Sequence, residues 1–209
     1  MSILINEIFP SIQGESNDAG YPTSFVRLSG CPLRCPWCDT KYAFAVGEKY
    51  SIAMICHKLA ELSLQRICIT GGEPLSQKNC PELIKTLADL NYKVSIETSG
   101  SVNIKNIDNR AVIVMDIKTP GSNHCCDNKI ENLQYLKSGD QIKFVINDKK
   151  DYQWAKNFIT THQIIKKNIT TLFSPVYNNL QPATMAQWLI TDKLDVKLQL
   201  QLHKIINMR

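Results

Sequence analysis

The feature that most constrains the fold of this chain is the alternation of short strand-like runs with longer stretches of helical period. Seven apolar, β-branched runs have the length and composition of buried strands, and four stretches with apolar residues at helical spacing lie between them. This alternation favours a mostly parallel sheet flanked by helices. The expected strands cover residues 23–28, 66–70, 93–97, 111–116, 141–146, 170–174 and 196–202, and the expected helices cover residues 51–62, 80–90, 151–161 and 182–194.

Polar motifs follow these expected strands at their C-terminal ends. A cysteine-rich loop follows residues 23–28, GGEP follows residues 66–70 and TSG follows residues 93–97. The same holds for IKTPGS after residues 111–116 and PVY after residues 170–174. Ligands bind at that edge of parallel α/β sheets and barrels, because loops from several strands converge there. We therefore expect one site that uses all of these motifs.

Length and composition predict one domain spanning residues 1–209. A chain of 209 residues is long enough for a single sizeable core, and no repeat or low-complexity linker divides it. No leader-like start and no apolar run of about 18 residues is visible, so we expect a cytoplasmic protein that does not span a membrane. The eight cysteines are then expected to be thiols, metal ligands or core residues rather than disulfides.

The charge of the chain excludes little. The net charge of +5 is spread along the sequence without a long basic block, so nucleic-acid binding is only weakly indicated and we expect no nucleic-acid partner. A modest basic excess is equally compatible with an anionic small substrate or cofactor.

Three cysteines, Cys31, Cys35 and Cys38, lie within eight positions. A structural zinc site needs four ligands, commonly two separated pairs, so zinc is disfavoured here, although Cys56 or Cys68 could complete such a site. An iron–sulfur cluster of four irons held by three thiolates would leave one iron without a protein ligand. That open iron could bind a small molecule.

The C-x3-C-x2-C spacing, with Trp37 in the last gap, resembles the cluster motif of radical S-adenosylmethionine (SAM) enzymes. In that superfamily the open iron binds SAM, and reductive cleavage gives methionine and a 5′-deoxyadenosyl radical. TGGEP at residues 70–74 resembles the second SAM motif of the superfamily. Gly71 and Gly72 suit a close backbone approach to a ligand, and the Glu73 carboxylate suits a ligand ammonium group.

The remaining motifs resemble the 7-carboxy-7-deazaguanine synthase family over nearly the whole chain. They are EIFPSIQGES, FVRLSGCPLRCPWCDTKY, IETSG, DIKTPGS, QIKFVI and QLHK. The resemblance implies conversion of 6-carboxy-5,6,7,8-tetrahydropterin to 7-carboxy-7-deazaguanine with loss of ammonia, on the route to queuosine and other 7-deazapurines. It also implies a shortened, partial β/α barrel of about six β-α units, a homodimer, SAM that is regenerated, a magnesium ion, and an external electron donor such as a flavodoxin.

The same resemblance implies a set of substrate-binding residues. Arg27 can hold a carboxylate in a bidentate fork, while Gln13 and Glu15 can match the donor and acceptor edge of an aminopyrimidinone ring. Taken singly, Arg27 could be a surface charge and Gln13 a polar turn residue. The implied substrate residues are Ile12, Gln13, Gly14, Glu15, Arg27, Thr98, His203 and the C-terminal Arg209.

Cofactor residues are implied in the same way. Thr40 resembles the magnesium ligand of the family, because hydroxyl oxygen is an acceptable ligand for this hard cation, although a threonine here could simply cap the following turn. The implied SAM-binding residues are Trp37, Cys38, Asp39, Gly71, Gly72, Glu73, Gly100, Gln141, Ile142, Lys143, Ser174, Pro175, Val176 and Tyr177.

Some positions depart from the pattern or stand outside it. Ser16 stands where the family usually has glycine, which we expect to alter the loop without removing Gln13 or Glu15. The HCC stretch at residues 124–126 is expected to be an ordinary loop, because adjacent cysteines are poorly placed to share one small ion. Core thiols are expected at Cys56, Cys68 and Cys80.

Two other functions are compatible with parts of the sequence. A glycyl-radical activase would share the cysteine and GGEP motifs but would have no use for the IQGE and ETSG segments. A non-catalytic zinc or iron–sulfur module would have no use for GGEP.

Overall fold

A nine-stranded sheet runs through the computed structural model, which describes residues 1–44 and 47–208. The strands are β1 (Ser2–Ile12), β2 (Pro22–Leu28), β3 (Glu48–Ser51), β4 (Arg66–Gly71), β5 (Lys93–Thr98), β6 (Val112–Asp116), β7 (Gln141–Ile146), β8 (Thr170–Pro175) and β9 (Lys197–Leu198). Their order is β3-β1-β2-β4-β5-β6-β7-β8-β9. From β2 to β9 all neighbours are parallel, whereas β1 pairs with β2 and β3 in antiparallel fashion.

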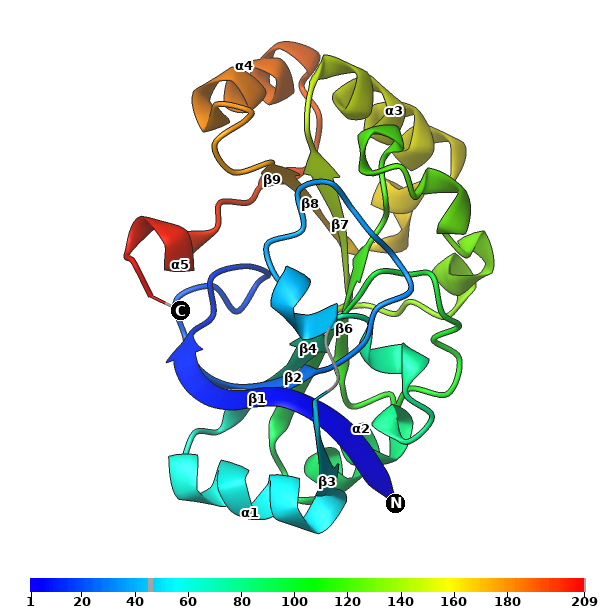
Figure 1. Cartoon of the computed structure of the whole chain (residues 1–209). Coiled ribbons are helices and arrows are strands. Elements are labelled where there is room, and N and C mark those ends of the chain that lie inside the picture. The colour runs from blue at the N-terminus through cyan, green and yellow to red at the C-terminus, as the bar shows by residue number, and fades with distance from the viewer. Residues whose placement is uncertain (45–46, 209) are drawn as a thin grey trace.

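The longer α-helices lie around the outside of this curved sheet, whereas the short C-terminal helix lies near the end of β1 (Figure 1). They are α1 (Ile52–Leu62), α2 (Cys80–Asp89), α3 (Lys149–Thr161), α4 (Pro182–Asp192) and α5 (Leu202–Ile205). The first four match the four expected helices and connect neighbouring parallel strands. The sheet does not close, so the predicted partial β/α barrel with mostly parallel strands is confirmed.

Two of the expected β-α units lack an α-helix in the described chain. Residues 99–111 between β5 and β6 form turns, and the crossover from β6 to β7 contains only the short 3-10 helices η3 (Pro120–Ser122), η4 (Cys125–Asp127) and η5 (Ile130–Gln134). These connections leave the middle of the sheet without a long helix. They carry the TSG and IKTPGS motifs instead.

Strand β1 was not expected from the sequence, because Pro10 interrupts its pattern. Within the described residues, β3 pairs with β1 only from Ser2 to Ile5, so Pro10 lies beyond the ladder between these two strands. A proline is tolerated there because it removes no hydrogen bond of that ladder. The expected strand at residues 196–202 was too long, since only Lys197 and Leu198 pair with β8 and α5 begins at Leu202.

The core lies between the sheet and the outer helices. Tyr152 of α3 and the facing residues Phe144 of β7 and Phe173 of β8 are fully buried, and their rings meet edge to face. Asp148 begins α3 by accepting hydrogen bonds from two main-chain N–H groups of the first turn. This packing fixes the strands whose C-terminal ends form the site. Among the described residues, no helix is long and apolar enough to cross a membrane.

Candidate active site

A cavity of about 510 Å³ lies on the concave side of the sheet. The cysteine loop, the loop after β1 and the C-terminal segment contribute to its wall together with β4 to β8. Of the residues predicted from the sequence, those that line it are Ile12, Gln13, Gly14, Glu15, Arg27, Cys31, Cys35, Trp37, Cys38, Asp39, Thr40, Gly71, Gly72, Thr98, Lys143, Ser174, Pro175, Val176, Tyr177 and His203. Segments distant in sequence therefore meet in one place, as the positions of the motifs predicted.

The three cysteines of the loop after β2 are partly exposed to this cavity. Arg34 stabilises the loop from within, because its guanidinium donates hydrogen bonds to the carbonyl oxygens of Cys31 (2.6 Å) and Leu33 (2.7 Å). The same guanidinium lies 4.3 Å from the ring centre of Phe44. Burial raises the pKa of the Cys31 and Cys35 thiols.

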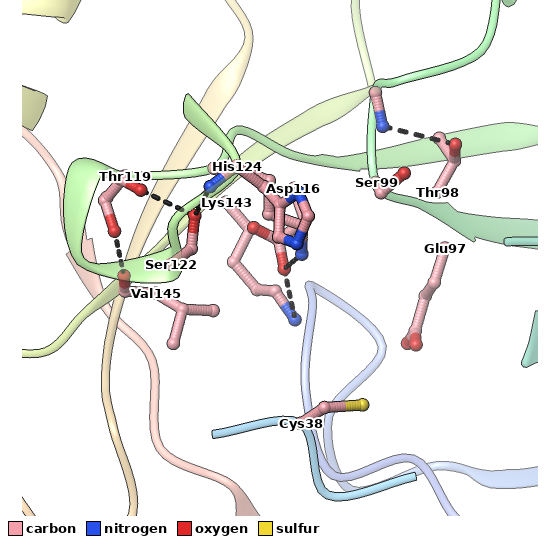
Figure 2. Close-up of polar contacts among 12 residues, drawn as sticks. Cys38, Glu97, Thr98, Ser99, Asp116, Thr119, Ser122, His124, Lys143 and Val145 are labelled. Carbon is pink, nitrogen blue, oxygen red and sulfur yellow. Dashed lines mark hydrogen bonds and ion pairs between the residues drawn. The ribbon is translucent and has the colours of Figure 1, made fainter. Parts of the chain in front are cut away.

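Charged side chains of β6 and β7 form a connected group inside the cavity. Lys143 Nζ lies 2.7 Å from Glu15 Oε2 and 3.8 Å from Asp116 Oδ2, and Lys118 Nζ lies 3.1 Å from the same Asp116 oxygen. Figure 2 shows Asp116 and Lys143 meeting on the side of the cavity that faces Cys38. Asp116 and Lys118 were not predicted, although the DIKTPGS motif contains both.

Glu15 and Lys143 form an ion pair that opposes the effect of burial on both pKa values. Burial raises the pKa of the Glu15 carboxyl, but the charge and hydrogen bond of Lys143 and the hydrogen bond from Gln201 together outweigh burial and hold that pKa below its usual value. Burial lowers the pKa of Lys143, but the charges of Glu15 and Asp116 reverse this effect and hold it well above the usual lysine value. Both side chains are therefore charged at neutral pH.

Glu97 of β5 is a further cavity residue that the sequence analysis missed. Its carboxylate accepts hydrogen bonds from Gln13 Nε2 (3.3 Å) and from Thr70 Oγ1 (3.0 Å). The amide oxygen of Gln13 accepts from the main-chain N–H of Glu15 (3.2 Å). The position of Glu97 one residue before the TSG motif was the available signal, because a residue there can point to the concave face of the sheet.

Arg27 lies inside the cavity wall rather than on the surface. Its Nε donates to Glu7 Oε1 at 2.7 Å, and only 13% of its side chain is exposed. The guanidinium lies between the rings of Phe9 and Tyr42, at 5.7 and 5.8 Å from their centres. The alternative that Arg27 is a surface charge is therefore wrong.

The C-terminal segment covers the loop after β1. Gln201 Nε2 donates to Glu15 Oε1 (2.8 Å), and Lys204 Nζ donates to Asp39 Oδ2 (3.0 Å). Burial raises the pKa of Asp39, but the charge and hydrogen bond of Lys204, the charge of Lys143 and the hydrogen bond from Gln201 together outweigh burial and lower it. Figure 1 shows α5 close to the end of β1. Neither Gln201 nor Lys204 was predicted as a site residue, although the QLHK motif contains both.

Comparison with known proteins identifies the family. The family model described as Radical SAM superfamily matches residues 25–120. The 7-carboxy-7-deazaguanine synthase of Koribacter versatilis is 39% identical to this chain over 97% of it and 96% of the relative. That of Chlorobaculum tepidum is also 39% identical, over 97% of this chain and 93% of the relative. The chain belongs to the 7-carboxy-7-deazaguanine synthase family.

Solved structures support the radical SAM fold of this 7-carboxy-7-deazaguanine synthase family member. The crystal structure of QueE from Escherichia coli superposes with a TM-score of 0.81 at 22% identity, covering 97% of this chain and 95% of that chain. Streptococcus suis SuiB bound to S-adenosylmethionine superposes with a TM-score of 0.58 at 14% identity, covering 81% of this chain and 44% of that chain.

The donor set fits the [4Fe–4S] cluster and SAM that membership of the radical SAM superfamily implies. Three thiols face a cavity with room for further ligands. Among residues 1–44 and 47–208, no three or more His, Cys, Asp or Glu side chains are arranged to hold one metal ion. A cluster does not require such convergence, because each thiolate binds a different iron.

The GGEP motif of this family member packs against the cysteine loop. A Cβ at Gly72 would collide with the carbonyl oxygen of Gly30, and Gly71 has a φ of 140° that favours glycine. At this contact, Gly72 N donates to the carbonyl oxygen of Leu28 at the end of β2, and Glu73 N donates to the carbonyl oxygen of Gly30. The glycines thus allow close approach to the cysteine loop, while Gly71 and Gly72 still line the cavity.

Glu73 is fully buried and does not line the cavity. Its carboxylate accepts hydrogen bonds from Leu75 N (2.9 Å), Thr98 Oγ1 (2.9 Å) and Ser99 N (2.6 Å). These contacts connect the end of β4 to the end of β5. The Glu73 carboxylate, which we expected to bind a ligand ammonium group, therefore accepts hydrogen bonds from groups of the protein itself.

Three other expected SAM residues lie behind the cavity wall. Gln141 Oε1 accepts from the main-chain N–H of Asn17 (2.9 Å), so it anchors the loop after β1. Ile142 is fully buried in the core, and the carbonyl oxygen of Gly100 accepts from Asn132 (3.1 Å). Arg209 lies outside the described residues.

Thr40 begins the 3-10 helix η1 (Lys41–Phe44) that follows the cysteine loop. Its carbonyl oxygen accepts from Ala43 N at 2.9 Å, while its hydroxyl lies 3.6 Å from Cys38 Sγ. The hydroxyl therefore faces the cavity rather than the turn. Cys68 and Cys80 are fully buried and Cys56 packs against the core, as expected.

Proposed function

We propose that this member of the 7-carboxy-7-deazaguanine synthase family converts 6-carboxy-5,6,7,8-tetrahydropterin to 7-carboxy-7-deazaguanine with loss of ammonia, in queuosine and 7-deazapurine biosynthesis. One observation carries the proposal: a single cavity joins the three cysteines to Arg27, Gln13, Glu15 and Glu97. Its volume of about 510 Å³ suits a bicyclic substrate beside a nucleoside cofactor. A glycyl-radical activase acts on a protein and has no need for this polar interior.

The cavity residues suit the two ends of the proposed substrate. The guanidinium of Arg27 is a partner for the substrate carboxylate, because its fork matches carboxylate geometry. Glu97 and Glu15 can accept from the amino and ring N–H groups of an aminopyrimidinone, and the Gln13 amide can both donate and accept. Thr98 and His203 are proposed to complete this pocket from β5 and α5.

When bound, the cluster and SAM supply a 5′-deoxyadenosyl radical that abstracts a hydrogen from the substrate. The protein's part is to bind, orient and exclude water. Cys31, Cys35 and Cys38 are the proposed cluster ligands. The proposed SAM contacts come from Trp37, Asp39, the Gly71–Gly72 backbone, Lys143 and residues 174–177.

Magnesium is proposed to bind Thr40, whose hydroxyl faces the cavity beside Cys38. Magnesium prefers hard oxygen ligands and fills its shell with water and substrate oxygens. Thr40→Ser keeps the oxygen and should keep the magnesium response of turnover. Thr40→Val removes the hydroxyl oxygen with little change of shape. If turnover of this variant responded to magnesium as the wild type does, Thr40 would not be a magnesium ligand.

The proposal includes the setting in which the enzyme works. We propose that residues 1–209 form one domain, that the chain acts as a homodimer in the cytoplasm, and that an external reductant such as a flavodoxin supplies the electron. The small-molecule nature of the substrate follows from the family.

The test is anaerobic reconstitution with iron and sulfide, followed by incubation with reductant, SAM, magnesium and the carboxytetrahydropterin. Mass spectrometry should detect the deazaguanine product in the wild-type protein. Cys56→Ala, outside the cysteine loop, serves as the matched control for Cys35→Ala, which should give no product. Absence of product with a fully loaded cluster would refute the substrate assignment, and release of 5′-deoxyadenosine would then still support a radical SAM activity.

A further inference from the structure

The cysteine loop is held from outside by His124, a residue that none of the roles above uses. The main-chain N–H of Arg34, between Cys31 and Cys35, donates to His124 Nε2 at 2.8 Å. The other ring nitrogen, Nδ1, lies 2.7 Å from Asp127 Oδ2. Because Nε2 accepts, the neutral ring carries its proton on Nδ1 and donates it to Asp127. Asp127 thereby fixes both the tautomer and the orientation of the ring.

The segment that carries His124 is anchored to the central sheet. His124 N donates to Ser122 Oγ (3.1 Å), and that hydroxyl donates to the carbonyl oxygen of Thr119 (2.6 Å). Thr119 Oγ1 in turn donates to the carbonyl oxygen of Val145 in β7 (3.1 Å). Figure 2 shows this chain of hydrogen bonds from Val145 to His124. The ring is therefore held at a fixed place relative to β7.

The same segment touches the cysteine loop at a second point. A Cβ added to Gly121 would lie 3.1 Å from Cη2 of Trp37, so this glycine packs against the indole. Gly121 N donates to Oδ1 of the buried Asp151 at 2.8 Å, which fixes its position. Contacts at Arg34 and at Trp37 flank Cys35 on both sides. Residues 119–127 thus support the part of the loop that carries the proposed central cluster ligand.

We propose that His124 is a positioning residue for the iron–sulfur cluster. By accepting the Arg34 N–H, it holds the loop between Cys31 and Cys35 in the cluster-binding conformation before the cluster arrives. Such partners orient metal ligands and are commonly important for affinity, although they do not touch the metal. This inference rests on the proposed assignment of Cys31, Cys35 and Cys38 as ligands.

The first test measures main-chain hydrogen exchange of residues 31–38 in the cluster-free protein. His124→Ala should speed exchange at Arg34 about fivefold, the factor that corresponds to a typical net hydrogen-bond free energy. His124→Gln can offer an amide oxygen as acceptor and should restore part of the protection. Asp127→Asn should also speed exchange at Arg34, but less than His124→Ala does. This variant provides the test if His124→Ala does not fold. His57→Ala is the control, because His57 is exposed on α1 and distant in sequence from the loop.

Unchanged exchange at Arg34 in both His124→Ala and Asp127→Asn would overturn the inference. The second test follows the rate of cluster uptake and the electron paramagnetic resonance spectrum of the reduced cluster. Slower uptake and an altered spectrum in His124→Ala, with recovery in His124→Gln, are expected. If exchange at Arg34 became faster while cluster uptake and the spectrum stayed as in the wild type, His124 would stabilise only the loop. That result would overturn the positioning role. Full cluster loading in Cys35→Ala would instead defeat the ligand assignment itself.

Discussion

The imidazole ring of His203 lies directly against the α-carbon of Gly14. A Cβ at position 14 would collide with His203 Nδ1 and would approach the main-chain nitrogen of His203 to 2.9 Å. Leu202 N donates to the Gly14 carbonyl oxygen at 2.9 Å, so the contact is part of a defined docking site. The glycine of the IQGE motif is thus required by the approach of α5, and both ends of the chain form one wall of the cavity.

Gly14→Ala is therefore expected to loosen the C-terminal segment without unfolding the sheet. Overpacking of this kind costs about 1–3 kcal/mol. Hydrogen exchange of residues 199–208 should become faster, and KM for the pterin should rise. Ala19→Ser in the same loop is the control, because Ala19 is exposed. Wild-type exchange of the C-terminal segment in Gly14→Ala would show that α5 does not depend on this contact.

The ion pair of Glu15 with Lys143 predicts a loss of stability in acid. Because the pKa of Glu15 in the folded protein lies below its usual value of 4.5, its contribution is fully present above about pH 4.5 and is lost as pH falls through the folded pKa. Glu15→Gln should lower stability at neutral pH by about 1–3 kcal/mol, since Lys143 loses its nearest partner. Urea unfolding from pH 7 to pH 3 should give a flatter stability curve for this variant. The exposed Glu61→Gln is the control, and equal slopes for Glu15→Gln and wild type would contradict the account.

Ser16 occupies a strained position. Its φ is 67°, in the left-handed region, and its hydroxyl accepts from Asp18 N at 3.1 Å. Ser16→Gly removes a backbone strain of about 1–2 kcal/mol but also a hydrogen bond of similar net value. We therefore expect the free energy of unfolding to change by less than about 1 kcal/mol. Ser16→Ala keeps the strain and loses the hydrogen bond, so it should be less stable than Ser16→Gly. Urea unfolding compares the two, and greater stability of the alanine variant would contradict this reading.

The sequence predicted the parallel strands, the long helices and most of the cavity lining, because each depends on a local pattern. Apolar alternation marks a buried strand, and a polar motif at its end marks the ligand edge. Strand β1 was missed because a proline such as Pro10 is tolerated in a strand only where no neighbouring strand needs its N–H group. Whether β3 pairs with that part of β1 depends on the length of β3, which is short. The pairing of β1 with β3 joins segments that are distant in the sequence, so no local pattern reveals it.

The same reason explains which contacts within the site the sequence did not reveal. The pattern that suggests Glu73 as an ammonium partner does not reveal that Thr98 and Ser99 occupy its carboxylate, since those residues come from another strand. Gln201 and Lys204 reach Glu15 and Asp39 only after the C-terminal segment folds back over the cavity. The QLHK motif contains both residues, but only the folded chain shows which partners they contact.

Glu73→Ala tests this revised role of the GGEP carboxylate. Charged hydrogen bonds of this kind are worth about 1.5–3 kcal/mol each, so the cluster-free protein should lose stability markedly in urea unfolding. Glu82→Ala, in the first turn of α2, is a control because Glu82 is exposed. Unchanged stability of cluster-free Glu73→Ala, together with weakened SAM binding, would return Glu73 to the cofactor site.

The central claim is that the cysteine loop and the polar interior form one radical SAM site for the carboxytetrahydropterin. The most direct measurement supplies the reconstituted protein with excess pterin, excess reductant and less SAM than enzyme, under anaerobic conditions. Product and 5′-deoxyadenosine are then counted by mass spectrometry. The account predicts more than one deazaguanine for each SAM supplied, because the proposed reaction regenerates SAM. Formation of 5′-deoxyadenosine from SAM with no deazaguanine would contradict it.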